Sequence, residues 1–166
     1  MNGNNKRLVL IGIDCGINGA IAAIDEKFNV LGLEDTPIIK AGGKSLYNVA
    51  EMSAILRRYA LLGDPFVIVG KAQVILSQGV TDILHTGFGF GLWCGILGAL
   101  EISAQIVMPS VWKQDILKGC PGEGKTRAIG FVTRMFPTAE LIPVGCRTPH
   151  DGRVEALFLA YCGVKK

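Results

Sequence analysis

The sequence lacks the marks of several protein classes. Its five cysteines are scattered and none are at zinc-finger spacing, so we expect reduced thiols and neither a disulfide framework nor a zinc site. No Pro-, Gly- or Ser-rich tract divides the 166 residues, which favours a single domain over residues 1–166. The longest apolar stretch, 88–100, is interrupted by glycines and is too short to span a bilayer. Residues 1–7 are polar, unlike a signal peptide. We expect one soluble, intracellular domain.

A strong charge excess is also missing, but the charge is unevenly distributed. The net charge is +3. Residues 104–166 hold nine Lys or Arg against five Asp or Glu, whereas residues 1–103 hold eight against nine. A basic C-terminal part makes nucleic acid a reasonable partner, although charge alone does not distinguish this from a solvated basic surface.

Hydrophobic periodicity and turn residues predict the order of the elements. The first three strands are separated by short turns and form an antiparallel meander, and the fourth follows a helix, which makes it parallel to the first. We expect loops at 36–45 and 72–86. The predicted strands are 8–14, 20–25, 30–33, 66–69 and 104–108, and the predicted helices are 47–62, 88–101, 111–117, 125–136 and 151–161. This order describes a five-stranded mixed sheet flanked by helices and resembles the ribonuclease H-like α/β fold.

The helix predicted at 88–101 carries glycines at a regular interval. Gly87, Gly91 and Gly95 recur every four residues, so one face lacks side chains and can approach another backbone closely. That partner is either the sheet of the same chain or the same helix of a second subunit.

Three carboxylates are candidates for metal binding. Asp14 ends an apolar run, and Asp151 and Glu155 lie one helical turn apart. Carboxylate oxygens are the ligands that hard cations such as Mg²⁺ require. Each signal has an ordinary explanation as well, because acidic pairs four residues apart are common on solvated helix faces and Asp is common in turns.

Five short segments, taken in order, strengthen the case that these carboxylates bind metal. They are 12–20 (GIDCGINGA), 67–73 (VIVGKAQ), 87–93 (GFGFGLW), 109–113 (PSVWK) and 151–157 (DGRVEAL). Together they resemble the RuvC-like Holliday junction resolvases, in particular the branch that contains the chloroplast resolvase and related bacterial and phage proteins. The resemblance extends from about residue 8 to residue 163.

The resemblance implies an enzyme, a crossover junction endodeoxyribonuclease of DNA recombination and repair. Such an enzyme makes paired symmetric nicks in a four-way DNA junction by two-metal hydrolysis, as a homodimer, with two Mg²⁺ ions per active site and Mn²⁺ as a substitute. By the same resemblance Asp14, Asp151 and Glu155 are metal ligands, and Lys113 lies near the scissile phosphate. Lys113 is alternatively an ordinary surface lysine. We expect a cytoplasmic location, in a bacterial or phage-infected cell, and no membrane partner.

The sequence departs from the family pattern at two places. Gly70 stands where the family has a catalytic glutamate, and the late acidic pair is spaced by four residues rather than the three of bacterial RuvC. Our hypothesis is that the parent protein has a glutamate at position 70 and that this chain is an impaired variant. The alternative is a natural, non-catalytic junction-binding protein.

Several further residues are candidates for contact with DNA. Phe88 and Phe90 are placed to stack on unpaired bases of a junction, although core packing explains them equally well. Basic side chains would contact phosphates. They are Lys71, Lys118, Lys125, Arg127, Arg134 and Arg153.

Other motifs offer rival interpretations. Residues 119–126 (GCPGEGKT) match the P-loop pattern GxxxxGK[ST], but they follow a predicted helix rather than a buried strand, so we interpret them as a glycine-rich connection. The Asp-x-Gly turn at Asp14 is also found in actin and sugar kinases, which are much longer two-domain proteins. His85 and His150 are potential ligands, and of the two only His150 adjoins the acidic pair.

Overall fold

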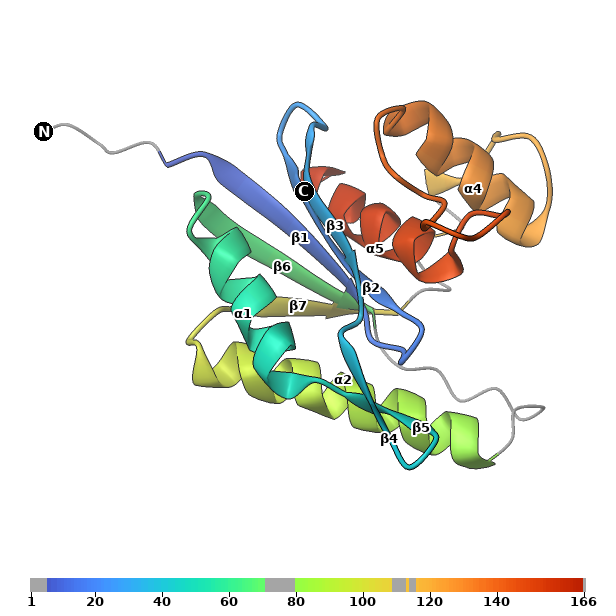
Figure 1. Cartoon of the computed structure of the whole chain (residues 1–166). Helices are drawn as coiled ribbons and strands as arrows, with labels where there is room; N and C mark the ends of the chain where they lie inside the picture. The colour runs from blue at the N-terminus through green and yellow to red at the C-terminus, as the bar shows by residue number, and fades with distance from the viewer. Residues whose placement is uncertain (1–5, 71–79, 109–112, 114–115, 166) are drawn as a thin grey trace, which may run out of the picture.

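The computed structural model describes residues 6–70, 80–108, 113 and 116–165. Its centre is a five-stranded sheet with the order β3-β2-β1-β6-β7 (Figure 1). The strands β1, β2 and β3 are antiparallel neighbours, and β1, β6 and β7 are parallel. Their bounds are Leu8–Asp14 for β1, Ala20–Asp25 for β2, Val30–Asp35 for β3, Asp64–Gly70 for β6 and Ala104–Val107 for β7. The predicted mixed sheet of five strands is confirmed.

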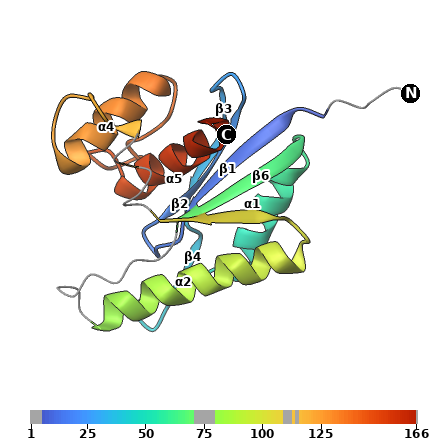
Figure 2. The same ribbon diagram turned by 180° about the vertical axis from the view of Figure 1, so that it is seen from behind.

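Helices cover both faces of this sheet, as Figures 1 and 2 show from opposite sides. The helices α1 (Val49–Ala60) and α2 (Val80–Ala99) lie on one face, and α4 (Gly124–Met135) and α5 (Asp151–Cys162) lie on the other, followed by the short 3₁₀ helix η1 (Gly163–Lys165). Among the described residues, no helix is long and apolar enough to cross a membrane.

Alternation along the central strands builds two cores, because successive side chains of a strand point to opposite faces. One core joins β1 to α1 and α2, and the other joins β1 and β2 to α4 and α5. The first contains Val9, Ile11, Ile13, Met52 and Trp93, and the second contains Leu10, Ala22, Phe131, Val132 and Leu157.

The predicted loop at 36–45 is wrong. The strands β4 (Ile38–Ala41) and β5 (Lys44–Tyr47) form an antiparallel hairpin there. Gly42 and Gly43 connect them with φ angles of +56° and +74°, which is the backbone that a tight two-residue hairpin turn requires. Because both strands are largely exposed, they lack the alternation of apolar and polar residues that would have identified them.

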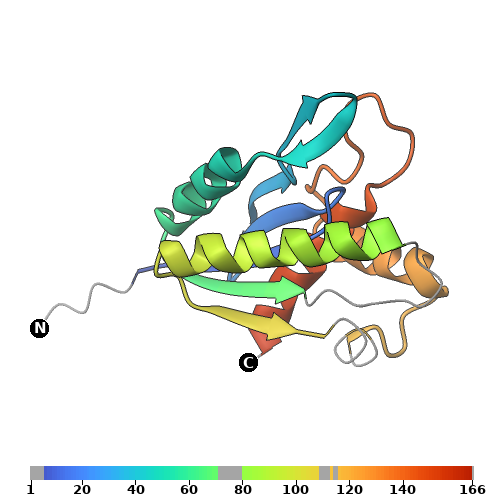
Figure 3. The same cartoon turned by 90° about the horizontal axis from the view of Figure 1, so that it is seen from below.

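The start of α2 also differs from the prediction. The helix begins at Val80 and not at residue 88, so the second half of the predicted loop 72–86 is helical. Residues 71–79 lie outside the described part of the chain, as does most of the helix predicted at 111–117, of which Lys113 and Ile116 are helical. Figure 3 looks onto α2, which crosses beneath the sheet.

The glycine stripe on α2 does not approach the body of this chain. A Cβ atom placed on Gly87, Gly91 or Gly95 would meet no described atom within 4 Å. Gly89 instead makes the close contact, because a Cβ there would lie 2.2 Å from the carbonyl oxygen of Cys15 and 2.3 Å from the hydroxyl of Tyr47. The first of the two predicted uses of the stripe, packing on the sheet of the same chain, is therefore wrong.

Candidate functional site

The site begins where two parallel strands end side by side. In the register of β1 and β6, Ile13 lies opposite Val69, so Asp14 and Gly70 follow as neighbours at the carboxyl ends of their strands. Both positions face α5, since a Cβ on Gly70 would first meet Leu159 of that helix, at 3.2 Å. The residue that the family pattern leads us to expect as glutamate is thus adjacent to Asp14.

Two glycine contacts bring α5 unusually close to this strand end. A Cβ on Gly12 would lie 2.0 Å from the carbonyl oxygen of Ala156, and a Cβ on Gly152 would lie 2.5 Å from the carbonyl oxygen of Asn18. Larger residues would therefore push the helix away. With α5 held in place, Asp151 and Glu155 come from one of its faces toward the end of β1.

The pKa of Asp14 is raised in this crowded place. Burial raises its pKa from 3.8 to about 6, with a further upward contribution from Glu155 and a smaller one from Asp151. A backbone hydrogen bond from Gly16 and the charge of Lys113 act in the opposite direction. Burial is the largest cause, so the raised pKa marks Asp14 as a desolvated carboxyl group that lies near two other acidic residues.

Lysines are bonded to both carboxylates of α5. Nζ of Lys113 donates a hydrogen bond to Oε1 of Glu155 at 2.6 Å, and Nζ of Lys125 donates to Oδ2 of Asp151. The structure thus brings Lys113 to Glu155, and it adds Lys125, which is separated from Asp151 by 26 positions in the sequence. The role of Lys113 near a scissile phosphate stays a prediction.

The donor chemistry of the site fits hard cations, but the side chains are not gathered around a common point. Asp14, Asp151 and Glu155 provide carboxylate oxygens, which suit Mg²⁺. No group of three or more His, Cys, Asp or Glu side chains among the described residues is placed to hold a metal ion. Asp151 and Glu155 are instead ion-paired with Lys125 and Lys113. Binding a cation would require these lysines to be exchanged.

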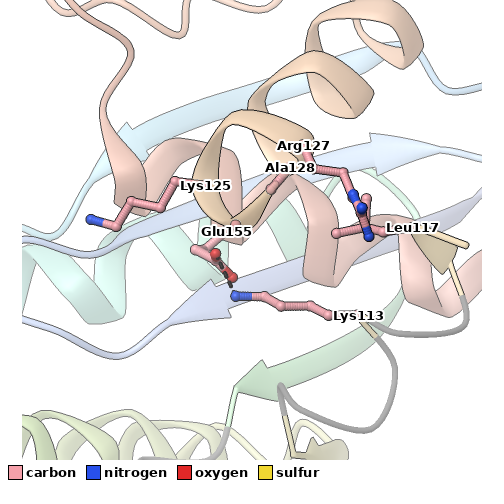
Figure 4. A pocket seen from close by; sticks show the side chains of 7 residues that line it. Lys113, Leu117, Lys125, Arg127, Ala128 and Glu155 are labelled. Atoms are coloured by element: carbon pink, nitrogen blue, oxygen red, sulfur yellow. Dashed lines mark hydrogen bonds and ion pairs between the residues drawn. The ribbon is translucent and has the colours of Figure 1, made fainter. Parts of the chain in front are cut away.

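A cationic hollow of about 390 Å³ lies beside the acidic residues (Figure 4). Its lining includes Lys113, Lys125 and Arg127, with the ammonium group of Lys125 pointing away from the other two in Figure 4, and Glu155 is the one carboxylate of its described lining. The lining is Lys113, Leu117, Gly124, Lys125, Arg127, Ala128 and Glu155. Its charge and size suit a phosphate group.

A second hollow, of about 270 Å³, contains Asp14 itself. His85 and Thr86 of α2 and the turn that follows β1 line it. His85 was not selected from the sequence, because its region was predicted to be a loop, and it shares this hollow with Asp14 because α2 starts early. His150, the other histidine, has Nδ1 3.6 Å from Oδ1 of Asp35 rather than among the site carboxylates.

The basic residues predicted to contact DNA have different environments. Lys118 and Arg134 are exposed, Arg127 is partly buried and donates from Nε to the carbonyl oxygen of Gly122 at 2.7 Å, and Lys71 lies outside the described residues. Arg153 is engaged in the fold, since it donates to both oxygens of Asp35, at 2.6 and 3.1 Å, and to the carbonyl of Glu140. Its side chain is 12% exposed. This arrangement argues against the prediction that Arg153 contacts phosphates.

The two phenylalanines that were predicted to contact DNA also have different environments. Phe88 is 58% exposed and lies edge-on to Tyr47, with ring centroids 5.9 Å apart. Phe90 is partly buried against the core between the sheet and α2. Phe88 is therefore available to a partner, whereas Phe90 contributes to packing.

The glycine-rich segment that matches the P-loop pattern does not follow a strand. Of the described residues just before it, Lys113 and Ile116 are helical and Leu117 and Lys118 are in a turn. Gly119, Gly122 and Gly124 have positive φ angles. Its lysine, Lys125, is bonded to Asp151. The structural context of a phosphate-cradling P-loop is thus missing from the described part of this region.

Solved structures similar to this chain include RuvC from Thermus thermophilus. RuvC in complex with a Holliday junction substrate is 16% identical, with a TM-score of 0.64 over 92% of this chain and 90% of that chain. A second structure, described as Thermus thermophilus RuvC, is 15% identical, with a TM-score of 0.57 over the same shares. No protein-family model and no curated protein matches the sequence.

At this identity the likeness establishes the fold. The chain has the fold of RuvC, and the predicted ribonuclease H-like fold is confirmed. The finer assignment, to the branch of the chloroplast resolvase, stays a prediction.

Proposed function

We propose that this chain binds four-way DNA junctions, and that it is a resolvase whose active site has lost one carboxylate. The observation that carries the proposal is the pair formed by Asp14 and Gly70. They are neighbours at the ends of β1 and β6, they face α5, and they lie within a fold that matches RuvC over 92% of the chain. The RuvC structure with a Holliday junction supports a junction as the partner.

The proposed chemistry is hydrolysis of a phosphodiester bond with Mg²⁺. Two Mg²⁺ ions, for which Mn²⁺ would substitute, would activate water and stabilise the leaving oxygen. Asp14, Asp151 and Glu155 would provide oxygen ligands, and Lys113, already beside Glu155, would orient or neutralise the phosphate. Each cleavage would leave a 5′-phosphate and a 3′-hydroxyl, as the family resemblance implies.

The glycine at position 70 explains why this chain would cleave poorly. Glycine has no ligand atoms, so a site built for four carboxylates retains three. A side chain at this position meets Leu159 at 3.2 Å, and the atom it meets is the far end of a flexible side chain. Leu159 can move by a few tenths of an ångström, so the backbone has room for the missing glutamate.

Two surfaces would serve the junction. Lys118, Lys125, Arg127 and Arg134 belong to the segment around the cationic hollow and would contact phosphates. Phe88, with 58% of its side chain exposed, would stack on unpaired bases near the strand exchange point.

A homodimer would present two such sites. Figure 3 looks onto the outer side of α2, and a Cβ atom on Gly87, Gly91 or Gly95 would have no described neighbour within 4 Å. Leu84 of the same helix is 69% exposed. A two-fold contact between these helices would cover the open face, and two-fold symmetry suits a substrate that needs two opposed nicks.

A second candidate function is junction binding without cleavage. Gly70 favours it if the residue is natural, and the lysine bonds to Asp151 and Glu155 are compatible with it because they neutralise the site without a metal. This candidate shares the DNA-binding surface with the first and differs only in its chemistry.

Competition binding tests the part that both candidates share. We would measure the affinity of the chain for a labelled four-way junction against unlabelled junction and linear duplex of the same sequences. We expect junction to compete at least about tenfold better than duplex, because shape rather than charge alone sets the preference. Equal competition would contradict both candidates.

A further inference from the structure

The ion pair between Lys125 and Asp151 is the starting point. Lys125 comes from the first turn of α4 and Asp151 from the first turn of α5. The side chains are 80% and 56% exposed, respectively. An ion pair this exposed to water contributes little to stability, so either partner can be exchanged at small cost.

The surroundings of Lys125 offer it a second position. The residue is part of the lining of the cationic hollow, together with Lys113 and Arg127, although its ammonium group points away from these two side chains in Figure 4. A phosphate in this hollow would meet Lys113 and Arg127, and also Lys125 once its side chain turned from Asp151 toward them. The same ammonium group is thus within reach of a carboxylate of the site and of a place suited to a DNA phosphate.

A divalent cation and Lys125 compete for the same oxygen atoms. Asp151 is one of the three carboxylates that would bind the cation, and Lys125 is bonded to its Oδ2 atom. A cation that takes Asp151 displaces the ammonium, and the displaced ammonium adds to the positive charge available in the hollow. By linkage, a phosphate that draws Lys125 away also exposes Asp151 to the cation.

We propose that Lys125 is a displaceable counter-ion, which holds Asp151 when no divalent cation is present and moves to a DNA phosphate in the hollow when a cation binds. Cation binding and DNA binding then strengthen each other through this one side chain. The inference rests on the proposed function, because it takes the cation and the DNA from it. A failure of this inference can nevertheless be distinguished from a failure of the proposed function. The coupling between cation binding and DNA binding depends on phosphate, whereas the proposed function depends on the shape of the DNA.

The coupling is measured by binding DNA with and without a cation. Junction and duplex affinities would be determined in EDTA and in saturating Ca²⁺, a probe cation, at equal ionic strength. For the unaltered chain we expect Ca²⁺ to raise both affinities by about fivefold or more. In Lys125→Gln the increase should fall to about twofold or less, the part due to direct contact between cation and phosphate.

Lys118→Gln is the matched control, because Lys118 is an exposed lysine of the same region with no role in the ion pair. It should weaken DNA binding in both conditions and leave the increase caused by Ca²⁺ unchanged. An equal increase in Lys125→Gln and in the unaltered chain would overturn the proposal. A loss of junction preference with the coupling intact would instead contradict the proposed function and leave this inference standing.

Cation binding without DNA provides an independent readout. Electron paramagnetic resonance of free Mn²⁺ reports its affinity for the protein alone. Lys125→Gln removes the competitor of the cation, so Mn²⁺ should bind about three- to tenfold more tightly, whereas Lys118→Gln should not change its affinity. Unchanged or weaker Mn²⁺ binding by Lys125→Gln would contradict the proposal.

A double-mutant cycle separates release of the lysine from the general effect of charge. Asp151→Asn frees Lys125 without a cation and also removes a negative charge near the DNA. In EDTA it should therefore strengthen DNA binding more in the Lys125 background than in the Lys125→Gln background, by a factor of about three or more. Equal gains in the two backgrounds would show that only the charge of Asp151 matters.

Discussion

Glycines occur where helices cover the sheet on both of its faces, but the surroundings of these glycines differ between the two faces. On the α5 side, Gly12 and Gly152 are in contact with backbone, and a Cβ atom at either would lie within 2.5 Å of a carbonyl oxygen. On the α2 side, Gly91 and Gly95 have no described neighbour within 4 Å of such an atom. The first pair fixes the distance between α5 and the end of β1. The second leaves a smooth, open face.

This difference shows that the role of a glycine depends on its neighbours and not on its spacing. The stripe with a regular interval of four, which stands out in the sequence, has no close neighbour in the described part of the chain. The glycines that position the acidic residues are isolated in the sequence and have no visible period. The site therefore depends on the less conspicuous pair.

The largest expected effect comes from filling the contact at Gly12. In Gly12→Val, side-chain atoms would overlap the backbone of α5, which cannot move aside as a side chain end can, so we expect a loss of about 3 kcal/mol or more in the free energy of unfolding. Gly95→Ala is the opposite case and should be neutral or stabilising by up to about 1 kcal/mol, because alanine favours the helix. Urea denaturation compares the two. Similar losses for both would contradict the distinction between the faces.

The next prediction concerns the open face of α2. If a second copy covers it, Gly91→Glu would place two carboxylates in the contact, and the dimer should dissociate about a hundredfold more readily while each protomer stays folded. Sedimentation equilibrium measures this, and circular dichroism checks the fold. Lys44→Glu, at an exposed position of the hairpin β4–β5, is the control for the added negative charge. A chain that is monomeric before substitution would rule out the dimer.

Asp14 allows a smaller but more specific test of the α5 side. Its pKa is raised from 3.8 to about 6, so between these values the folded state holds a proton that the unfolded state has released. Stability is therefore lost as the pH rises through about 6. Asp14→Asn removes this dependence, and its stability relative to the unaltered chain should increase by about 2 kcal/mol between pH 4 and pH 7.

This comparison must be made in EDTA, so that bound cations do not contribute. Urea denaturation at several pH values gives the difference. A constant difference across the range would mean that Asp14 is solvated like an ordinary surface carboxylate, and that α5 does not crowd it.

Much of the fold could be predicted because its strongest signals are local. The apolar run of β1 and the helical spacing of Val154, Leu157 and Phe158 in α5 predict these elements to within a residue or two. The hairpin β4–β5 was missed because its exposed strands carry no alternation, and two adjacent glycines are as typical of a loop as of a tight turn. The early start of α2 was missed because its first residues show no helical period.

The site could be predicted only in part. Asp14, Asp151, Glu155 and the gap at Gly70 came from the resemblance, and the structure places Gly70 beside Asp14. The bond between Lys125 and Asp151 and the position of His85 depend on elements that are distant in sequence and meet only in the fold. The bond between Arg153 and Asp35 is of the same kind, because Asp35 is 118 positions away in the sequence and nothing near Arg153 indicates it as a partner.

The most direct test of the account restores the missing carboxylate. We would compare Mg²⁺-dependent cleavage of a labelled four-way junction by the unaltered chain, by Gly70→Glu and by Gly70→Ala, which fills the same space without a ligand. We predict that only Gly70→Glu makes paired nicks, at least about a hundredfold faster than the other two, because it alone restores an oxygen ligand. Equal cleavage by all three, or none by any of them, would contradict the claim that this is a resolvase disabled at position 70.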